Sequence, residues 1–384
     1  MRVALAHKRL DLRGGTERDF YRTAEGLRDL GHEVHLFCSE FEVPAPGGVQ
    51  SHRLPTCPLG RTARLLSFAF LGPKTISACQ SDVVVGFGRM VAQDILRSGG
   101  GTHRGFLKKM AEGEGALRRL WHRVSLYHRS VLAVEKLQYR PQGCKKVLAV
   151  SQEVKREIMA IYGVPDDKIT VIYNGVDHER FYPANRARYR ELVRRQLGIP
   201  SEAALVLFVG NGFQRKGLDR LLRVWGSPRL EQVYLLVVGE DGQRSRYTSW
   251  AQREAKGRVV FTGRQDSVQG YYGAADLLAL PALQEAFGNV ILEALASGLP
   301  VLTSRAVGAA ELLEGELREG ILANPDDDRE VEARLLRLLD RNRRPSLSDQ
   351  ARRLGERYSW KNHFRELEGY LQEVVEMGRR GACS

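Results

Sequence analysis

The stretch PALQEAFGNVILEALASGLPVLTS, residues 281–304, carries two glutamates, Glu285 and Glu293, eight positions apart. The apolar run DLLALP leads into it and PVLTS ends it, and both have the length of buried strands. The residues from Gly288 onward follow the spacing of a helix. A strand, a helix and a second strand in this order predict one unit of a parallel α/β sheet. Glu285 then lies in the loop at the carboxyl end of the first strand, where open α/β sheets bind ligands.

The same alternation of short β-branched runs and helical segments extends over the rest of the chain. In the first half the expected strands are Val3–Ala6, Glu33–Cys38, Val83–Phe87 and Lys146–Ser151, and a second series begins near residue 203. We expect two parallel-sheet domains, residues 1–184 and 185–357, divided in a turn-rich stretch. The last segment, 358–384, is amphipathic at helical spacing and is expected to pack back on the first domain.

The composition fits a globular protein of two domains, because 384 residues exceed the size of one ordinary core. The longest apolar run, LLSFAFLG at 65–72, is far shorter than the roughly 20 residues that a membrane-spanning helix needs. The five cysteines lie apart without a CxxC pair, which predicts reduced thiols and no zinc site. The acidic run NPDDDREVEARLL suits an ordinary helix start. We therefore expect neither a metal nor another cofactor.

The positive charge points to a polyanionic partner, since the formal net charge is +13. The segment Arg104–Arg140 holds nine Lys and Arg against three acids, with apolar residues at helical spacing between them. A basic amphipathic helix of this kind predicts contact with an anionic membrane surface. A helix that packs on its own domain with a solvated basic face remains the alternative. A nucleic-acid-binding protein is disfavoured, because the chain has no groove-reading helix or stacking motif.

The helix that begins at Gly288 suits an anionic ligand. Its first N–H groups, near Asn289 and Val290, attract a phosphate through hydrogen bonds and the helix dipole, and glycine allows close approach. Glu293 lies further along the same helix, where a carboxylate can accept hydrogen bonds from ribose hydroxyls. Glu285, at the strand end, is placed to contact a sugar. The arrangement predicts a nucleotide-sugar site, although two glutamates on the surface of a helix are the simpler alternative.

A second motif, FVGNGFQRKGLDRLLRVW at 208–225, places Arg215 and Lys216 after a strand and before a helix. Two cations at the carboxyl end of a strand suit a diphosphate, since arginine binds it as a fork and lysine as a point charge. An isolated Arg-Lys pair is usually a solvated surface pair. Its position next to the glutamate motif favours a diphosphate site.

Three stretches together, GNGFQRKGLDRLL, EAFGNVILEALASGLPV and VIYNGVD, resemble glycosyltransferase family 4, whose members are retaining enzymes that use nucleotide sugars. The resemblance covers essentially the whole chain and includes the family's paired glutamates, its basic pair and its glycine loop. It implies an α/β GT-B fold, in which two Rossmann-like domains with parallel sheets face a central cleft. The first domain would bind the acceptor and the second the nucleotide-sugar donor.

The resemblance also implies roles for individual residues. On the donor side, Arg215 and Lys216 would hold the diphosphate, Glu285 the transferred sugar and Glu293 the ribose. The other donor-binding positions would be Gly14, Gly15, Phe287, Gly288, Asn289 and Val290. On the acceptor side stand Asp19, Asp94 and His103, and the catalytic candidates are Lys216, Arg215, Glu285, Asp19 and His103.

The acceptor-side residues have simpler interpretations too. Asp19 lies early in a predicted helix, where an acid is favoured by the dipole, and Asp94 suits a helix cap. His103 follows the glycine-rich run SGGGT, which would let its side chain reach a ligand.

Within the family, GGTERDFYRTAEGLRDLGHEV and VVVGFGRMVAQDIL are most similar to the lipopolysaccharide core glucosyltransferase I subgroup. This likeness implies transfer of a hexose, glucose from a UDP-sugar, to a lipid-linked saccharide at the cytoplasmic face of the membrane. Another glycolipid or polysaccharide acceptor, or a GT-B-fold nucleotide-sugar epimerase, remains an alternative. The residues alone leave open the sugar, the base, the acceptor and the oligomeric state.

Overall fold

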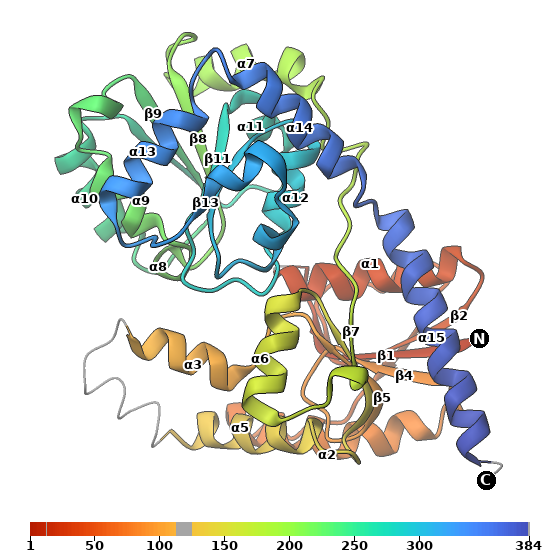
Figure 1. Cartoon of the computed structure of the whole chain (residues 1–384). Helices are drawn as coiled ribbons and strands as arrows, with labels where there is room; N and C mark the ends of the chain where they lie inside the picture. The colour runs from red at the N-terminus through yellow and green to blue at the C-terminus, as the bar shows by residue number, and fades with distance from the viewer. Residues whose placement is uncertain (13, 113–124, 383–384) are drawn as a thin grey trace. The chain divides into compact units, whose positions relative to one another are not determined.

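The computed structural model describes residues 1–12, 14–112 and 125–382. The chain divides into two compact units. The N-terminal unit consists of Met1–Tyr173 with Trp360–Ser384, and the C-terminal unit consists of Asn174–Ser359. Each unit is built on a sheet whose paired strands run parallel, flanked by helices (Figure 1). The sequence placed the division at residue 184, and the N-terminal unit ends at Tyr173.

The N-terminal sheet has seven strands in the order β3-β2-β1-β4-β5-β6-β7. Their bounds are β1 Arg2–Leu10, β2 Glu33–Phe41, β3 Gln50–Arg53, β4 Val83–Gly86, β5 Gln93–Ser98, β6 Cys144–Ala149 and β7 Ile169–Val171. The helices described here are α1 Gly15–Asp29, α2 Gly60–Ser77, α3 His103–Glu112, α5 Leu126–Gln138 and α6 Gln152–Tyr162. The strand order reverses between β1 and β4, so that ligands are expected beyond the carboxyl ends of these strands.

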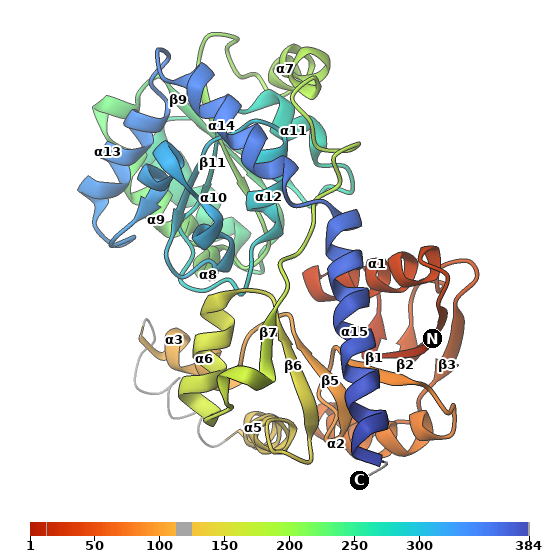
Figure 2. The ribbon, with the colours of Figure 1, turned by 45° about the vertical axis from the view of Figure 1, so that its right-hand side comes forward.

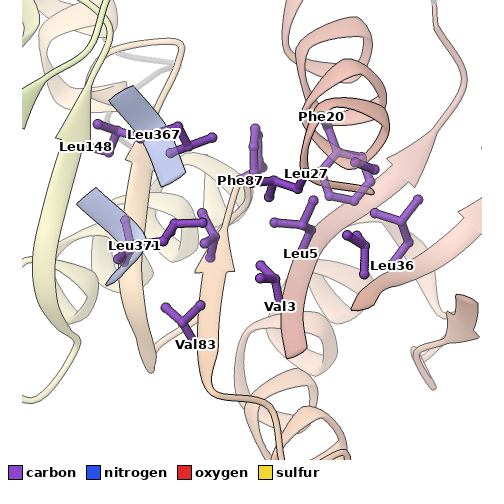
Figure 3. Close-up of a cluster of buried hydrophobic side chains, with 14 of the residues drawn as sticks. Val3, Leu5, Phe20, Leu27, Leu36, Val83, Phe87, Leu148, Leu367 and Leu371 are labelled. Carbon is purple, nitrogen blue, oxygen red and sulfur yellow. The ribbon is translucent and has the colours of Figure 1, made fainter. Parts of the chain in front are cut away.

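The last helix, α15 (Trp360–Ala382), completes the core of the N-terminal unit. Figure 3 shows Leu367 and Leu371 among the side chains of Val3 and Val83, and Figure 2 shows the helix lying against the sheet. Gly26 of α1 admits the ring of Phe364, because a Cβ there would lie 2.3 Å from it. The N-terminal unit is therefore built from both ends of the chain.

The C-terminal sheet has six strands in the order β10-β9-β8-β11-β12-β13. The strands are β8 Ala204–Val209, β9 Val233–Val238, β10 Val259–Gly263, β11 Leu277–Leu280, β12 Val301–Ser304 and β13 Ile321–Leu322. The helices are α7 Asn185–Gln196, α8 Phe213–Lys216, α9 Leu218–Val224, α10 Arg244–Ala255, α11 Gln269–Ala274, α12 Asn289–Ala296, α13 Asp328–Leu338 and α14 Arg344–Glu356. The order reverses between β8 and β11, and the two sequence motifs follow these two strands.

Asp276 anchors the helices α7 and α14 to this sheet. Its carboxylate is fully buried, and it also accepts a hydrogen bond of 2.9 Å from the backbone N–H of Leu205. Four arginines form ion pairs with it: Arg186, Arg190, Arg194 and Arg344. The buried charge is thus compensated from several sides.

Across the described residues, no helix is both long and apolar enough to cross a membrane.

Candidate active site

The loops that follow β8 and β11 touch each other at the reversal of the C-terminal sheet. The backbone N–H of Leu283 donates to the carbonyl of Arg215 at 2.8 Å, and the Arg215 guanidinium donates to the carbonyl of Gln284 at 2.8 Å. These contacts bring residues that lie about 70 positions apart in the sequence to one point.

Three predicted donor-side residues form an ion cluster at this contact. One carboxylate oxygen of Glu285, Oε2, lies 2.9 Å from Nη1 of Arg215 and 3.2 Å from Nζ of Lys216. Burial alone would raise the pKa of Glu285, but the positive charges of Lys216 and Arg215 outweigh it and lower the pKa. The carboxylate therefore stays ionised and holds both cations in place.

The backbone of Glu285 is fixed by the loop after β12. Its N–H donates to the carbonyl of Ala306 at 3.0 Å, and its carbonyl accepts from the N–H of Gly308 at 3.0 Å. The position of the ion cluster is thus set by main-chain pairing.

Two glycines with positive φ allow the loops to come this close. At Gly217, φ is +85° and a Cβ would lie 2.0 Å from the carbonyl oxygen of Pro281. At Gly288, φ is +90° and a Cβ would lie 2.9 Å from the side chain of Val307. Both sites favour glycine for conformation and for space.

Helix α12 begins directly after Gly288, with Asn289 and Val290 as its first residues. The first N–H groups of a helix have no partner inside it and carry partial positive charge. The side-chain oxygen of Asn289 accepts a hydrogen bond of 2.8 Å from Asn174, and the carbonyl of the buried Phe287 accepts one of 2.8 Å from Ala309. The helix start is therefore held firmly.

Glu293, in the same helix, accepts a hydrogen bond of 2.6 Å from the hydroxyl of Tyr272. Burial and the charge of Glu293 raise the pKa of Tyr272, so this phenol stays protonated. The hydrogen bond orients the Glu293 carboxylate. Its contact with a ribose stays a prediction.

The N-terminal unit contains a cavity of about 580 Å³. It opens at the carboxyl ends of β1, β2, β4 and β5 and includes the glycine-rich loop after β5. Its lining contains six lysines and arginines and three glutamates: Lys8, Arg9, Arg61, Arg64, Arg89, Arg97, Glu17, Glu40 and Glu135. The cavity therefore has an excess of positive charge.

His103 lies in the wall of this cavity, as the first residue of α3. Its backbone N–H donates to a carboxylate oxygen of Glu135 at 2.6 Å, and its Nε2 lies 3.0 Å from Nδ1 of His128. The buried Glu135 also accepts from the N–H of Arg104 at 3.1 Å, so it caps the start of α3.

Asp19 is buried in α1 and does not line the cavity. One of its oxygens, Oδ2, accepts from Nε and Nη2 of Arg97 at 2.9 and 2.6 Å, and Arg97 does line the cavity. His363 of α15 lies near this pair, and burial together with the charge of Arg97 lowers its pKa to about 4. Asp19 is thus placed to orient Arg97.

Asp94 does not lie near the cavity that His103 lines. It is the second residue of β5, at the amino end of the strand, whereas the cavity lies at the carboxyl end. Its carboxylate accepts from the N–H of Val84 at 2.8 Å and pairs with Lys145 at 2.8 Å. The sequence did not reveal β5, and so placed Asp94 in a helix cap or an acceptor site.

The glycine pair lies at the start of α1. Gly14 precedes the helix and Gly15 is its first residue. A Cβ on Gly15 would meet no described atom within 4 Å, while one on Gly14 would overlap the carboxylate of Glu17, which lines the cavity. A donor contact at these glycines stays a prediction.

Part of the basic segment Arg104–Arg140 falls on residues 113–124, which lie outside the described residues. In the described part, Val131 is buried in the core and Leu126 is exposed at the start of α5. The guanidinium of Arg61, in α2, lies 4.6 Å from the ring centre of Tyr127, in α5. Some apolar residues of this segment therefore belong to the core, as expected for a helix that packs on its own domain.

The cations of the cavity were missed in the sequence. Lys8 and Arg9 end a strand, and Arg61 and Arg64 open a helix about 50 positions later. The charged pair Lys8-Arg9, one residue after the apolar run VALA, was the one available signal, because it marks the carboxyl end of a strand.

Comparison with known proteins finds two family models, one in each half of the chain. The family model described as Glycosyltransferase Family 4 matches residues 13–180, and the one described as Glycosyl transferases group 1 matches residues 203–341. The chain is 27% identical to lipopolysaccharide glucosyltransferase WaaG of Escherichia coli over 315 residues, which cover 81% of this chain and 82% of WaaG. It is 30% identical to the probable transglycosylase BTH_I0986 of Burkholderia thailandensis, over 82% of this chain and 80% of that protein.

A third relative, the D-inositol 3-phosphate glycosyltransferase of Salinispora tropica, is 32% identical over 60% of this chain and 51% of that protein. The crystal structure of WaaG matches 96% of this chain and 99% of its own, with a TM-score of 0.79 and 25% identity. This match confirms the predicted GT-B fold, with its two parallel-sheet domains. The chain is a glycosyltransferase and belongs to glycosyltransferase family 4/group 1.

Proposed function

We propose that the protein is a retaining hexosyltransferase of lipopolysaccharide core biosynthesis. It moves a sugar, with glucose as the first candidate, from a UDP-sugar to a lipid-linked saccharide. The observation that carries the proposal is the cluster of Arg215, Lys216 and Glu285 beside the start of α12. The similarity to WaaG, a lipopolysaccharide glucosyltransferase, supports the choice of sugar and pathway.

The proposed chemistry centres on the diphosphate leaving group. Negative charge grows on its β-phosphate as the sugar departs, and preorganised cations stabilise such charge most strongly in the transition state. Lys216 and Arg215 supply two positive charges, and the first N–H groups of α12 supply hydrogen bonds. Glu285 keeps the two cations in position, and in this proposal it also contacts the sugar hydroxyls.

In this proposal the configuration at the anomeric carbon is retained, because the acceptor hydroxyl attacks the face of the sugar that the leaving group vacates. Glu285 and Glu293 belong to one loop and the helix that follows it, so they cannot flank a glycosidic bond as the paired carboxylates of glycosidases do. The departing phosphate oxygen accepts the proton of the acceptor hydroxyl. The protein contributes alignment and charge stabilisation. Because two side-chain cations face the diphosphate, we propose that transfer needs no divalent metal.

Lys216→Ala tests this assignment. We expect kcat to fall between roughly 10- and 1,000-fold, because the enzyme loses one of the two positive charges that stabilise the leaving phosphate. Circular dichroism and the thermal midpoint should stay close to those of the wild type. Arg246→Ala, which removes an exposed arginine of α10, is the matched control and should keep normal turnover. Near-normal kcat in Lys216→Ala would exclude the diphosphate role.

We also propose that the acceptor enters the cavity of the N-terminal unit and carries a phosphate or carboxylate group. Each glutamate of the lining already has a basic partner: Glu17 with His7 at 3.4 Å, Glu40 with Arg64 at 2.6 Å and Glu135 with Arg89 at 2.9 Å. Among the residues that the structure describes, Lys8 and Arg61 line the cavity and form no ion pair with a carboxylate. The hydrogen bond with His7 lowers the pKa of Glu17, and the charge of Lys8 helps to lower it from a greater distance. Unpaired cations in a concave site favour an anionic group.

Arg61→Ala should therefore raise the KM for an anionic acceptor at least about fivefold and leave the KM for the donor unchanged. Arg61→Lys should restore part of the loss, because it restores the charge. Arg156→Ala, on the exposed side of α6, is the control. The same rise in KM with an acceptor whose phosphates have been removed would show that Arg61 acts on packing and not on the anion.

For localisation we propose that the protein works at the cytoplasmic face of the membrane, where Arg104–Arg140 contacts anionic lipid. The nine basic residues of this segment support the proposal. Binding to liposomes should rise with the fraction of anionic lipid and fall as salt increases, measured by flotation. Equal binding to zwitterionic vesicles would contradict an electrostatic contact.

A further inference from the structure

Three side chains from separate segments of the N-terminal unit meet near the edge of its sheet. His35 lies on β2, His52 on the edge strand β3, and Cys79 two residues beyond the end of α2. Nδ1 of His35 is 2.8 Å from Nε2 of His52 and 3.2 Å from Sγ of Cys79, and all three atoms lie within 4.8 Å of one another. Their spacing along the chain concealed the group in the sequence.

The surroundings of His35 are those of a metal ligand. Its other nitrogen, Nε2, lies 3.0 Å from a carboxylate oxygen of Glu33. A carboxylate at this position accepts a hydrogen bond from the Nε2–H. The lone pair of Nδ1 is then directed at the other two side chains, as it is in metal-binding histidines whose second nitrogen donates to a carboxylate. Glu33 is itself held by Arg2, at 3.1 Å.

The other two side chains are also fixed from outside the group. The ring of His52 stacks on Phe37, with ring centres 4.6 Å apart. Arg2 donates to the carbonyl of Cys79 at 3.2 Å, which holds the backbone beside the thiol. His35 is buried, whereas His52 and Cys79 are partly exposed, so that an ion can reach the group from solvent.

We propose that His35, His52 and Cys79 bind one zinc ion, with a water as the fourth ligand. Two imidazole nitrogens and one thiolate form a ligand set suited to zinc, and three protein ligands leave one position open. None of the three residues lines the cavity or belongs to the donor cluster, so the ion would be structural. It would join the short edge strand β3 and the end of α2 to β2.

The geometry requires only a small adjustment. Tetrahedral zinc with Zn–N bonds of about 2.0 Å and a Zn–S bond of about 2.3 Å separates its two nitrogen ligands by roughly 3.3 Å and nitrogen from sulfur by roughly 3.5 Å. The present separations of 2.8 and 3.2 Å are those of hydrogen bonds, so His35 would move away from the other two ligands by roughly 0.3–0.5 Å, while all three ligand atoms already lie within 4.8 Å of one another. On binding, the Cys79 thiol releases its proton to solvent. His52, whose Nε2–H donates to His35 in the absence of the ion, exchanges that proton for one on Nδ1, so that both coordinating nitrogens carry a lone pair.

The test uses the full-length chain without an affinity tag, freed of metal by a chelator and then titrated with zinc chloride. We expect one zinc per chain by calorimetry and a higher midpoint of thermal unfolding. Cobalt(II) should give the near-ultraviolet absorption of a thiolate–cobalt bond and the visible bands of a tetrahedral site. The cobalt spectrum identifies the thiolate independently of any effect on activity.

Variants identify the ligands. Cys79→Ser and His52→Ala should each weaken zinc binding by about 100-fold or more and remove the stabilisation, while circular dichroism stays native. Cys57→Ser removes another partly exposed thiol of the same unit and should bind zinc as the wild type does. Failure of the wild type to bind zinc, or undiminished binding in both Cys79→Ser and His52→Ala, would overturn the proposal.

Discussion

Asp276 stands at the amino end of β11, where a buried carboxylate meets four arginines. Burial alone would raise its pKa, but the hydrogen bond from Arg186 and the charges of Arg344 and Arg190 outweigh it and lower the pKa to about 2. Because the folded pKa lies below the usual 3.8, the ionised group stabilises the C-terminal unit above about pH 4. That contribution is lost as the pH falls from about 4 to 2.

The size of this effect is about 2 kcal/mol, from a pKa change of nearly two units. Asp276→Asn should lower the unfolding free energy at pH 7 by roughly 3–5 kcal/mol, because four buried or half-buried arginines lose their counter-charge. The difference from wild type should shrink between pH 4 and pH 2 in urea unfolding. Asp349→Asn, at an exposed acid, is the control. A constant difference over this range would contradict the linkage.

At this scale the sequence identified some residues and not others. Arg215, Lys216 and Glu285 were found because each follows a recognisable strand, and the ends of neighbouring parallel strands meet. Their ion pairing was not visible, since it depends on how two loops touch. Asp94 was placed on the acceptor side because its strand, β5, was not recognised, although the structure puts it at the other end of the sheet.

The loop between β8 and α9 shows how an element is shaped by its glycines. Gly212 and Gly217 both have positive φ and bound the four-residue helix α8, which carries the two cations. Gly217 also lets the carbonyl of Pro281 approach. The sequence predicted a strand before the two cations and a helix after them. The break between α8 and α9 could not be predicted, because it depends on space left by the β11 loop.

Gly217→Ala tests the coupling of these two loops. The new methyl group would lie 2.0 Å from the Pro281 oxygen and would sit at a φ of +85°. We expect a loss of about 2–4 kcal/mol in unfolding free energy and weaker donor binding, since the loops must separate. Thermal melts and donor titration measure the two effects. Gly242→Ala, where a Cβ meets open space, should be neutral. Unchanged donor binding in Gly217→Ala would show that the loop contact is dispensable.

On the scale of the whole molecule, the alternation of strands and helices was enough to predict two parallel-sheet domains. The division predicted at residue 184 differs from the limit of the N-terminal unit at Tyr173 for a physical reason. The segment after Tyr173 is rich in turn residues and resembles a linker, yet Val176 and Phe181 are buried in the C-terminal unit. The N–H of Val176 donates to the carbonyl of Tyr358 at 2.8 Å, so the two connections between the units lie side by side. A pairing between residues so far apart in the chain cannot be recognised from the local sequence around either one.

The core that α15 completes has a consequence for synthesis. The segment Leu367–Val374 supplies buried side chains to a sheet that begins at Arg2. A nascent chain therefore exposes the apolar side chains of the N-terminal sheet that pack on α15 long before α15 leaves the ribosome. The C-terminal unit is contiguous and can close first. The half translated first is expected to mature last, and chaperones that bind nascent apolar strands should engage it for most of translation.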